Sequence, residues 1–84
     1  MKRFLLFSGV NYYPRGGMGD FNDSFDTLEA ARQRVQLASE SWHKFVVDGF
    51  NVDWAEIVDC QTSNRWYLVT NTNVKEIVWK EGWY

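Results

Sequence analysis

Residues 11–25, NYYPRGGMGDFNDSF, hold most of the side chains whose types could carry chemistry. Paired glycines let backbone N–H groups approach a ligand closely, and successive N–H groups form a concavity that holds anions. A neighbouring arginine adds a planar fork that fits a phosphate or a carboxylate, and aromatic faces stack on bases. The segment therefore predicts a binding pocket for a phosphate-bearing small ligand such as a nucleotide, made by Tyr12, Tyr13, Arg15, Gly16, Gly17, Asp20 and Phe21.

The same segment has a purely structural interpretation. Pro14 and the glycine pair build a turn, Tyr13 and Phe21 fill the open end of a sheet, and Asp20 caps backbone N–H groups. The glycines match neither a GxGxxG nor a GxxxxGK[ST] phosphate-binding motif. Under both interpretations residues 11–25 are predicted to form an ordered loop, because they show no helical or strand periodicity and are too aromatic for a disordered segment.

Catalytic and metal-binding signals are weak elsewhere in the chain. The single histidine, His43, lies near the end of a predicted helix, where a cation is favoured. The single cysteine, Cys60, lies in a polar turn with no histidine near it in sequence. Asp20, Asp23 and Asp26 are three residues apart, but they lack the spacing and the final Glu of a calcium loop. The sequence predicts a non-enzymatic protein with no catalytic residue, no metal site and no cofactor.

Length and composition narrow the class of protein. The 84 residues form one predicted domain, residues 1–84, and 45% of them are hydrophobic. A net charge of −2 and a pI near 5.2 disfavour direct binding to duplex nucleic acid, which requires Lys and Arg to neutralise phosphates. No stretch approaches the length of a transmembrane helix, and the apolar run near the N-terminus is too short for an export signal. A cytoplasmic protein that does not bind membranes is expected.

Local patterns predict the first elements. A continuous apolar run over residues 3–8, bounded by Gly9, predicts a central strand covered on both faces. A helix is predicted to begin at Asp26, an N-cap acceptor that Glu29 follows three residues later. Steps of three and four residues then predict one apolar helical stripe, formed by Leu28, Ala31, Val35, Ala38 and Trp42.

The second half of the chain predicts a hairpin. Residues 43–52 are predicted to be mostly loop, with Asp48 and Gly49 in a turn. Residues 54–59 and 66–70 are β-branched and aromatic runs separated by a polar turn, which predicts two paired strands. Residues 74–79 fit an edge strand or a short helix. This β-α-β-β-β order predicts an α+β domain with two layers, in which one helix packs on a small, mainly antiparallel sheet of three to four strands.

The five tryptophans predict both core and interface. Trp54 and Trp66 flank the hairpin and are predicted to form a cross-strand pair in the core. Trp79, Trp83 and Tyr84 are harder to bury in one small subunit, so they are predicted to form an interface between subunits of a homo-oligomer. The final strand would then pair with its twin, as an uncovered edge strand can.

The sequence also resembles a family of small uncharacterised proteins from phages and bacteria. The resemblance covers about three quarters of the chain: a YYPxGGxxDF loop, an FxTxEEA helix start and a tryptophan-containing IVD hairpin. The matching positions are Tyr12, Tyr13, Pro14, Gly16, Gly17, Asp20, Phe21, Phe25, Thr27, Glu29, Ala30, Trp54, Ile57, Val58 and Asp59. It implies a shared fold and a phage or mobile-element setting, and for a phage-encoded protein the host cytoplasm is the expected location. It implies no established activity.

Two functions are compatible with these observations. The first is a binding module that sequesters a phosphate-bearing small ligand, such as a nucleotide signal, without transforming it. The alternative is an interaction protein that inhibits a host defence protein or nuclease through its aromatic and acidic surface, because Trp and Tyr are frequent interface anchors.

Overall fold

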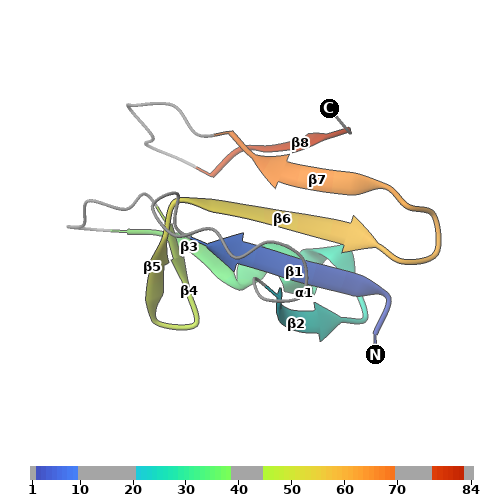
Figure 1. Cartoon of the computed structure of the whole chain (residues 1–84), viewed down its shortest axis with the longest axis horizontal. Helices are drawn as coiled ribbons and strands as arrows, with labels where there is room; N and C mark the ends of the chain where they lie inside the picture. Colours follow the sequence, from blue (N-terminus) through green and yellow to red (C-terminus); the bar gives the residue numbers. More distant parts are fainter. Residues whose placement is uncertain (1, 10–20, 39–44, 70–76, 83–84) are drawn as a thin grey trace.

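The computed structural model describes residues 2–9, 21–38, 45–69 and 77–82. Of these residues, 58% lie in strands and 11% in one short helix, so the predicted α+β class is wrong and the protein is mainly β. The elements, in chain order, are β1 (Phe4–Gly9), β2 (Phe21–Phe25), α1 (Leu28–Gln33), β3 (Val35–Leu37), β4 (Phe45–Val47), β5 (Phe50–Val52), β6 (Trp54–Asp59), β7 (Arg65–Leu68) and β8 (Trp79–Glu81) (Figure 1).

The strands form two antiparallel sheets. The main sheet has the order β2-β1-β6-β7-β8, and the small sheet has the order β3-β4-β5. The predicted first strand is confirmed as β1, which pairs with β2 on one side and β6 on the other. The predicted hairpin is confirmed as β6 and β7, with Ile57 opposite Trp66. Residues 79–81 form strand β8, whereas residues 74–76 of the segment predicted as an edge strand or a short helix lie outside the described part.

The chain passes from the small sheet to the main sheet at one residue. Asp53 alone separates β5 from β6, and its N–H donates a hydrogen bond to the carbonyl oxygen of Gly9 at 2.8 Å. In Figure 1 the hairpin β4–β5 consequently runs across the direction of β6. A strand that bends from one sheet into the next is a common way to form the corner of a two-sheet core.

The helix begins close to the predicted position but is much shorter than predicted. Thr27, rather than Asp26, is the N-cap, and its Oγ1 accepts a hydrogen bond from the N–H of Ala30 at 3.1 Å. The helix ends at Gln33, and Val35 then enters β3 opposite Val47. An isolated helix of this length is marginal, and a β-branched valine fits a strand well. Pairing with a distant strand therefore overrides the helical periodicity.

Residues 45–52 form a hairpin, so the prediction that residues 43–52 are mostly loop is wrong for this part. Asp48 and Gly49 do form the predicted turn, with φ angles of 52° and 83°. Two successive positive φ values are the signature of the type I′ turn, whose twist matches the twist of the flanking strands. The Asp-Gly pair therefore connects β4 to β5.

The predicted loop over residues 11–25 is also wrong at its end. Residues 21–25 form β2, which pairs with β1 and contains an irregularity in register between Leu6 and Phe7. This bulge inserts Asn22, and it hides the period-two alternation on which a sequence-based strand prediction depends. Residues 11–20 lie outside the described part of the chain.

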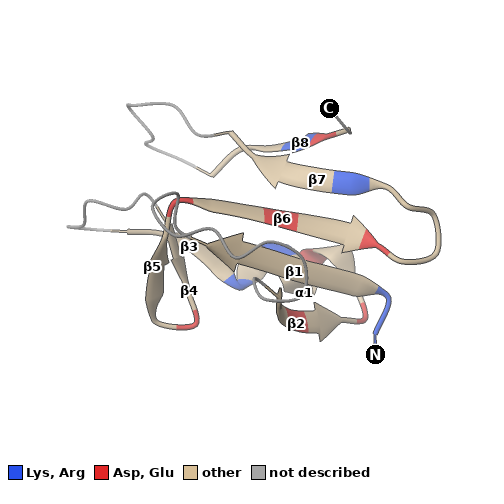
Figure 2. Cartoon of the chain, in the orientation of Figure 1, with Lys and Arg blue, Asp and Glu red and all other residues tan. Residues whose placement is uncertain are grey.

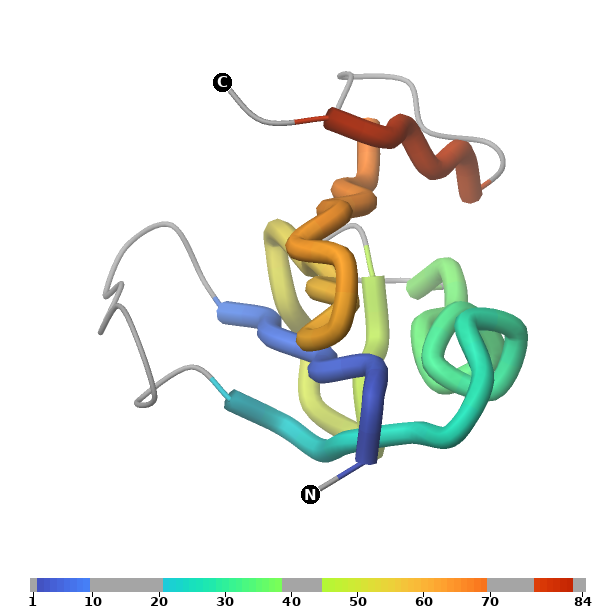
Figure 3. Tube along the Cα trace, turned by 90° about the vertical axis from the view of Figure 1, so that its right-hand side faces the viewer, coloured from blue at the N-terminus to red at the C-terminus, as the bar shows by residue number. Residues whose placement is uncertain are grey.

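The core lies on one face of the main sheet, here called the inner face. Figures 1 and 3 both place α1 on this side of β1 and β2, and Ala31 of the helix is fully buried there. Strands β1 and β6 alternate buried and half-buried residues, so β1 is central in the sheet but not equally covered on both faces. The buried apolar residues are Phe4, Leu6, Phe25, Ala31, Val35, Phe45, Val47, Val52, Ala55, Ile57, Trp66 and Leu68.

Candidate functional site

The opposite face of the main sheet, here called the outer face, carries half-buried apolar and aromatic side chains. Strand alternation assigns Leu5, Phe7, Phe21, Trp54, Val58 and Tyr67 to this face. Each of the six is of intermediate exposure. In the described part of the chain, the helix lies on the inner side of this sheet (Figure 3). The outer face therefore carries four partly accessible aromatic rings, those of Phe7, Phe21, Trp54 and Tyr67.

Three of these rings gather at one end of the outer face, here called the aromatic end: Phe7, Phe21 and Trp54. The rings of Phe7 and Phe21 meet edge to face, with centroids 5.7 Å apart and planes at 66°. Trp54 pairs with Gly9 across β1 and β6 and is a diagonal neighbour of Phe7. The indole lies against Gly9, because a Cβ at residue 9 would be 2.9 Å from Trp54 Cζ2.

The aromatic end adjoins the segment that the sequence singles out. Gly9 ends β1 and Phe21 begins β2, so these residues bracket residues 10–20. Of the predicted ligand-binding residues, Phe21 lies in the described part, whereas Tyr12, Tyr13, Arg15, Gly16, Gly17 and Asp20 lie outside it. Phe7, Gly9 and Trp54 were missed as site residues, because only strand pairing gathers them: β1 pairs with β2 and brings Phe7 beside Phe21, and β1 pairs with β6 and adds Trp54.

A buried arginine lies farther along the outer face. Arg65 is 4% exposed; its Nε donates to Glu56 Oε2 at 2.6 Å and its Nη1 to the carbonyl oxygen of Gly82 at 3.1 Å. Its guanidinium carbon lies 4.7 Å from the ring centroid of Tyr67. These contacts hold the charge in place between β6, β7 and the end of β8. They make Arg65 a structural residue of the outer face.

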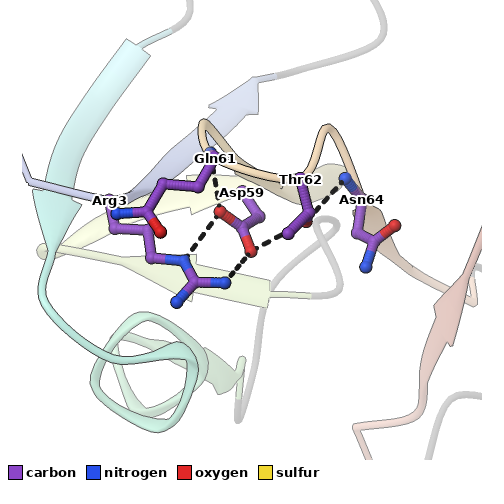
Figure 4. Close-up of polar contacts among 5 residues, drawn as sticks. All are labelled: Arg3, Asp59, Gln61, Thr62 and Asn64. Atoms are coloured by element: carbon purple, nitrogen blue, oxygen red, sulfur yellow. Dashed lines mark hydrogen bonds and ion pairs between the residues drawn. The ribbon is translucent and has the colours of Figure 1, made fainter.

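A second polar cluster ties the N-terminus to the β6–β7 turn (Figure 4). Asp59, 2% exposed, accepts hydrogen bonds from Arg3 Nε at 2.9 Å and Arg3 Nη2 at 2.7 Å, and from Gln61 N–H and Thr62 Oγ1, each at 2.9 Å. The pKa of Asp59 is held well below its usual range, mainly by the bidentate contact with Arg3 and also by the hydrogen bonds from Gln61 and Thr62. A carboxylate so fully bonded is suited to structure rather than to proton transfer.

The remaining polar features include no cluster of metal ligands within the described residues. No three His, Cys, Asp or Glu side chains lie together there in a way that could hold a metal ion. Cys60 is exposed in the β6–β7 turn, and His43 lies outside the described part. Figure 2 shows acidic and basic residues interspersed along the described strands. Within the described residues, no helix is long and apolar enough to cross a membrane.

A polar depression of about 320 Å³ lies between the end of the helix and the side of the small sheet that faces away from the core. It is lined by Gln33, Arg34, Gln36, Val46, Asp48 and Gly49. Its arginine is already engaged: Arg34 Nη1 is 2.7 Å from Asp48 Oδ1 and 3.8 Å from Asp23 Oδ2. The guanidinium also lies over the ring of Phe25, 5.0 Å from its centroid. These contacts leave Arg34 poorly suited to capture an anion.

The predicted tryptophan contacts differ in outcome. Trp66 is buried in the core, whereas Trp54 lies on the outer face, so the two do not form a cross-strand pair. Of the predicted interface residues, Trp79 lies in β8 opposite Leu68 and packs against the core. Trp83 and Tyr84 lie outside the described part.

Comparison with known proteins identifies a family. The model of the family described as Bacteriophage T4 protein Y07C matches residues 4–67, which are 64 of the 84 residues. This supports the predicted phage setting. No curated protein and no solved structure matches the chain. Since the match spans well over half of the sequence, from β1 into β7, the chain belongs to the Bacteriophage T4 protein Y07C family.

Proposed function

We propose that this protein is a non-enzymatic binding protein that sequesters a phosphate-bearing small ligand of the nucleotide class. The observation that carries the proposal is the aromatic end, where Phe7, Phe21 and Trp54 lie on one face beside the two strand ends that bracket residues 10–20. Those residues contain Arg15 and the glycine pair. A site for a base and the segment that holds the proposed phosphate contacts are thus neighbours in the chain.

The proposed division of roles follows from the chemistry of the residues. An aromatic face contributes roughly 1–3 kcal/mol per stacked base and tolerates different bases. The backbone N–H groups of Gly16 and Gly17 and the guanidinium of Arg15 are the proposed phosphate contacts. A sequestering protein needs no group that transfers a proton or attacks the ligand. In a phage-infected cell, such a protein would act in the host cytoplasm by lowering the free ligand concentration.

Native mass spectrometry of the purified protein, before and after addition of mono- and cyclic nucleotides, tests this proposal. We expect a retained or added mass of nucleotide size, one per chain. Arg15→Ala should abolish it without lowering the melting temperature, whereas Arg32→Ala, on the helix, should leave it unchanged. A protein that binds no member of the panel, or whose binding is insensitive to Arg15→Ala, would refute the proposal.

A second candidate function, inhibition of a host protein, is favoured by the extent of the apolar and aromatic surface on the outer face. Leu5, Val58 and Tyr67 extend the apolar and aromatic surface beyond the aromatic end, and aromatic residues are enriched in protein interfaces. The partner would be a host defence protein or nuclease that the phage protein inhibits. Affinity capture from host lysate tests it: one stoichiometric partner, lost on Tyr67→Ala and kept on Arg15→Ala, would favour this function over ligand sequestration.

A further inference from the structure

The most exposed large hydrophobic side chain in the described part of the chain is Phe50, which lies in strand β5. Phe50 is 73% exposed, compared with 41% for Val78 and 37% for Leu37. The register places Phe50 opposite Val47, and Val47 opposite Val35. Both valines are buried in the core. Phe50 therefore belongs to the core-facing side of the small sheet and continues its apolar row beyond the last strand.

The edge formed by β5 also lacks the features that prevent strands from pairing. Among the described edge strands, β2 carries a bulge and Asp23, and β8 carries Lys80 and Glu81. The third, β3, reads Val-Gln-Leu and is also uncharged, but its exposed apolar residue, Leu37, is 37% exposed, compared with 73% for Phe50. Strand β5 reads Phe-Asn-Val, with no charge, no proline and no irregular register. Natural sheets usually protect such edges with those devices.

The turn determines which backbone groups of β5 point outward. The residues that flank a two-residue hairpin turn, here Val47 and Phe50, form a hydrogen-bonded pair. The N–H and C=O of the next residue, Asn51, therefore point away from β4. Backbone groups of alternate residues in a strand point to the same side, so those of Asp53 also point away from β4. The N–H of Asp53 indeed donates to the carbonyl oxygen of Gly9. Asn51 thus presents one donor and one acceptor at the free edge.

We infer that β5 pairs with β5 of a second copy of this chain, antiparallel and about a twofold axis at Asn51. In that register, Asn51 forms two reciprocal backbone hydrogen bonds with its twin, and Phe50 lies opposite Val52 of the other copy. The core-facing sides of both small sheets then lie on the same side of one six-stranded sheet. No charged residue of β5 faces a like charge, because the strand has none. The same strand of a second copy thus meets the outward backbone groups of Asn51 and the apolar side chains of β5 with matching partners.

The pairing is weak and depends on concentration. A stable dimer buries about 800 Å² per partner, whereas burial of a phenylalanine removes roughly 150–250 Å². Sedimentation equilibrium of the full chain over a concentration series should therefore show monomer and dimer together. Phe50→Lys should raise the dimer dissociation constant at least tenfold. Leu37→Lys, which places the same charge on the other edge of the same sheet, should change it less than twofold.

Disulfide trapping locates the contact independently. Paired residues of a hydrogen-bonded antiparallel site have Cα atoms about 5.5 Å apart, within the range that a disulfide spans. In a Cys60→Ser background, Asn51→Cys should form a covalent dimer under mild oxidation at least tenfold faster than Gln36→Cys on β3. A chain that stays monomeric at every concentration, equal effects of Phe50→Lys and Leu37→Lys, or equal cross-linking of the two cysteine variants would overturn the inference.

Discussion

The indole of Trp54 lies against Gly9 of the neighbouring strand so closely that any side chain at residue 9 would require the indole to move. A Cβ at residue 9 would be 2.9 Å from Cζ2 and 3.1 Å from Cε2 of the indole. Both atoms belong to a rigid indole ring, so the ring must shift as a whole. Gly9 is therefore needed for close packing of the aromatic end.

Gly9→Ala is expected to displace the indole and destabilise the protein by about 1–3 kcal/mol, the usual cost of overpacking. Urea unfolding measures the free energy, and near-ultraviolet circular dichroism reports the position of the ring. The matched control is Gly9→Ala combined with Trp54→Ala. In that background the added methyl group should cost much less; an unchanged cost would show that the Trp54 contact is not the reason for glycine.

Asp59→Asn tests the cluster that joins the N-terminus to the β6–β7 turn. The neutral amide cannot accept the bidentate charged contact from Arg3, so the melting temperature at neutral pH should fall. The pKa of Asp59 is lowered in the folded protein. The stabilisation is therefore fully present above the pKa of an unfolded-chain aspartate, about 3.9, and is lost as the pH falls from there through the lower folded-state pKa.

The measurement for this cluster is the melting temperature as a function of pH. The difference between the native sequence and Asp59→Asn should be constant near neutrality and shrink in acid. Asp26→Asn is the control, because Asp26 is exposed and lies 3.8 Å from Lys2 Nζ. A difference that does not change with pH would mean that Asp59 acts through packing alone.

Gly49→Ala tests the turn between β4 and β5. Gly49 has a φ of +83°, and no atom lies within 4 Å of the position of an added Cβ. The cost is therefore conformational, about 1–2 kcal/mol for a residue with a Cβ in this left-handed region. Gly49→Asn, which tolerates the region better, should cost less in the same urea titration. Equal costs for the two variants would argue against a conformational origin.

Glu56→Gln tests the buried charge on the outer face. The carboxylate accepts a hydrogen bond from Arg65 Nε at 2.6 Å. The neutral amide of Gln accepts a weaker hydrogen bond and carries no charge to balance the buried guanidinium. Destabilisation of about 1–3 kcal/mol is expected in chemical denaturation. Glu81→Gln, on the exposed edge strand β8, should change the free energy of unfolding by less than about 0.5 kcal/mol. Similar losses for both variants would contradict a specific role for the Glu56–Arg65 contact.

Local chemistry was enough to predict several features of this protein. The apolar run before Gly9, the polar turn between two aromatic runs, and the Asp-Gly pair correctly predicted β1, the β6–β7 hairpin and the turn at residues 48–49. The start of α1 was predicted to within one residue. Each of these signals depends on residues close together in sequence. Phe21, a candidate site residue from the same local chemistry, lies on the outer face, and its role in binding stays a prediction.

Only the tertiary structure decided the fold class and the composition of the aromatic end. The stripe of Leu28, Ala31 and Val35 fits a helix locally, but Val35 lies in a strand because β4 supplies a hydrogen-bonding partner from beyond the helix. Phe7 and Trp54 share a face because β1 pairs with β6, although 46 residues separate them. The partner of a strand is chosen by burial and backbone pairing across the whole chain, and a local pattern does not contain that information.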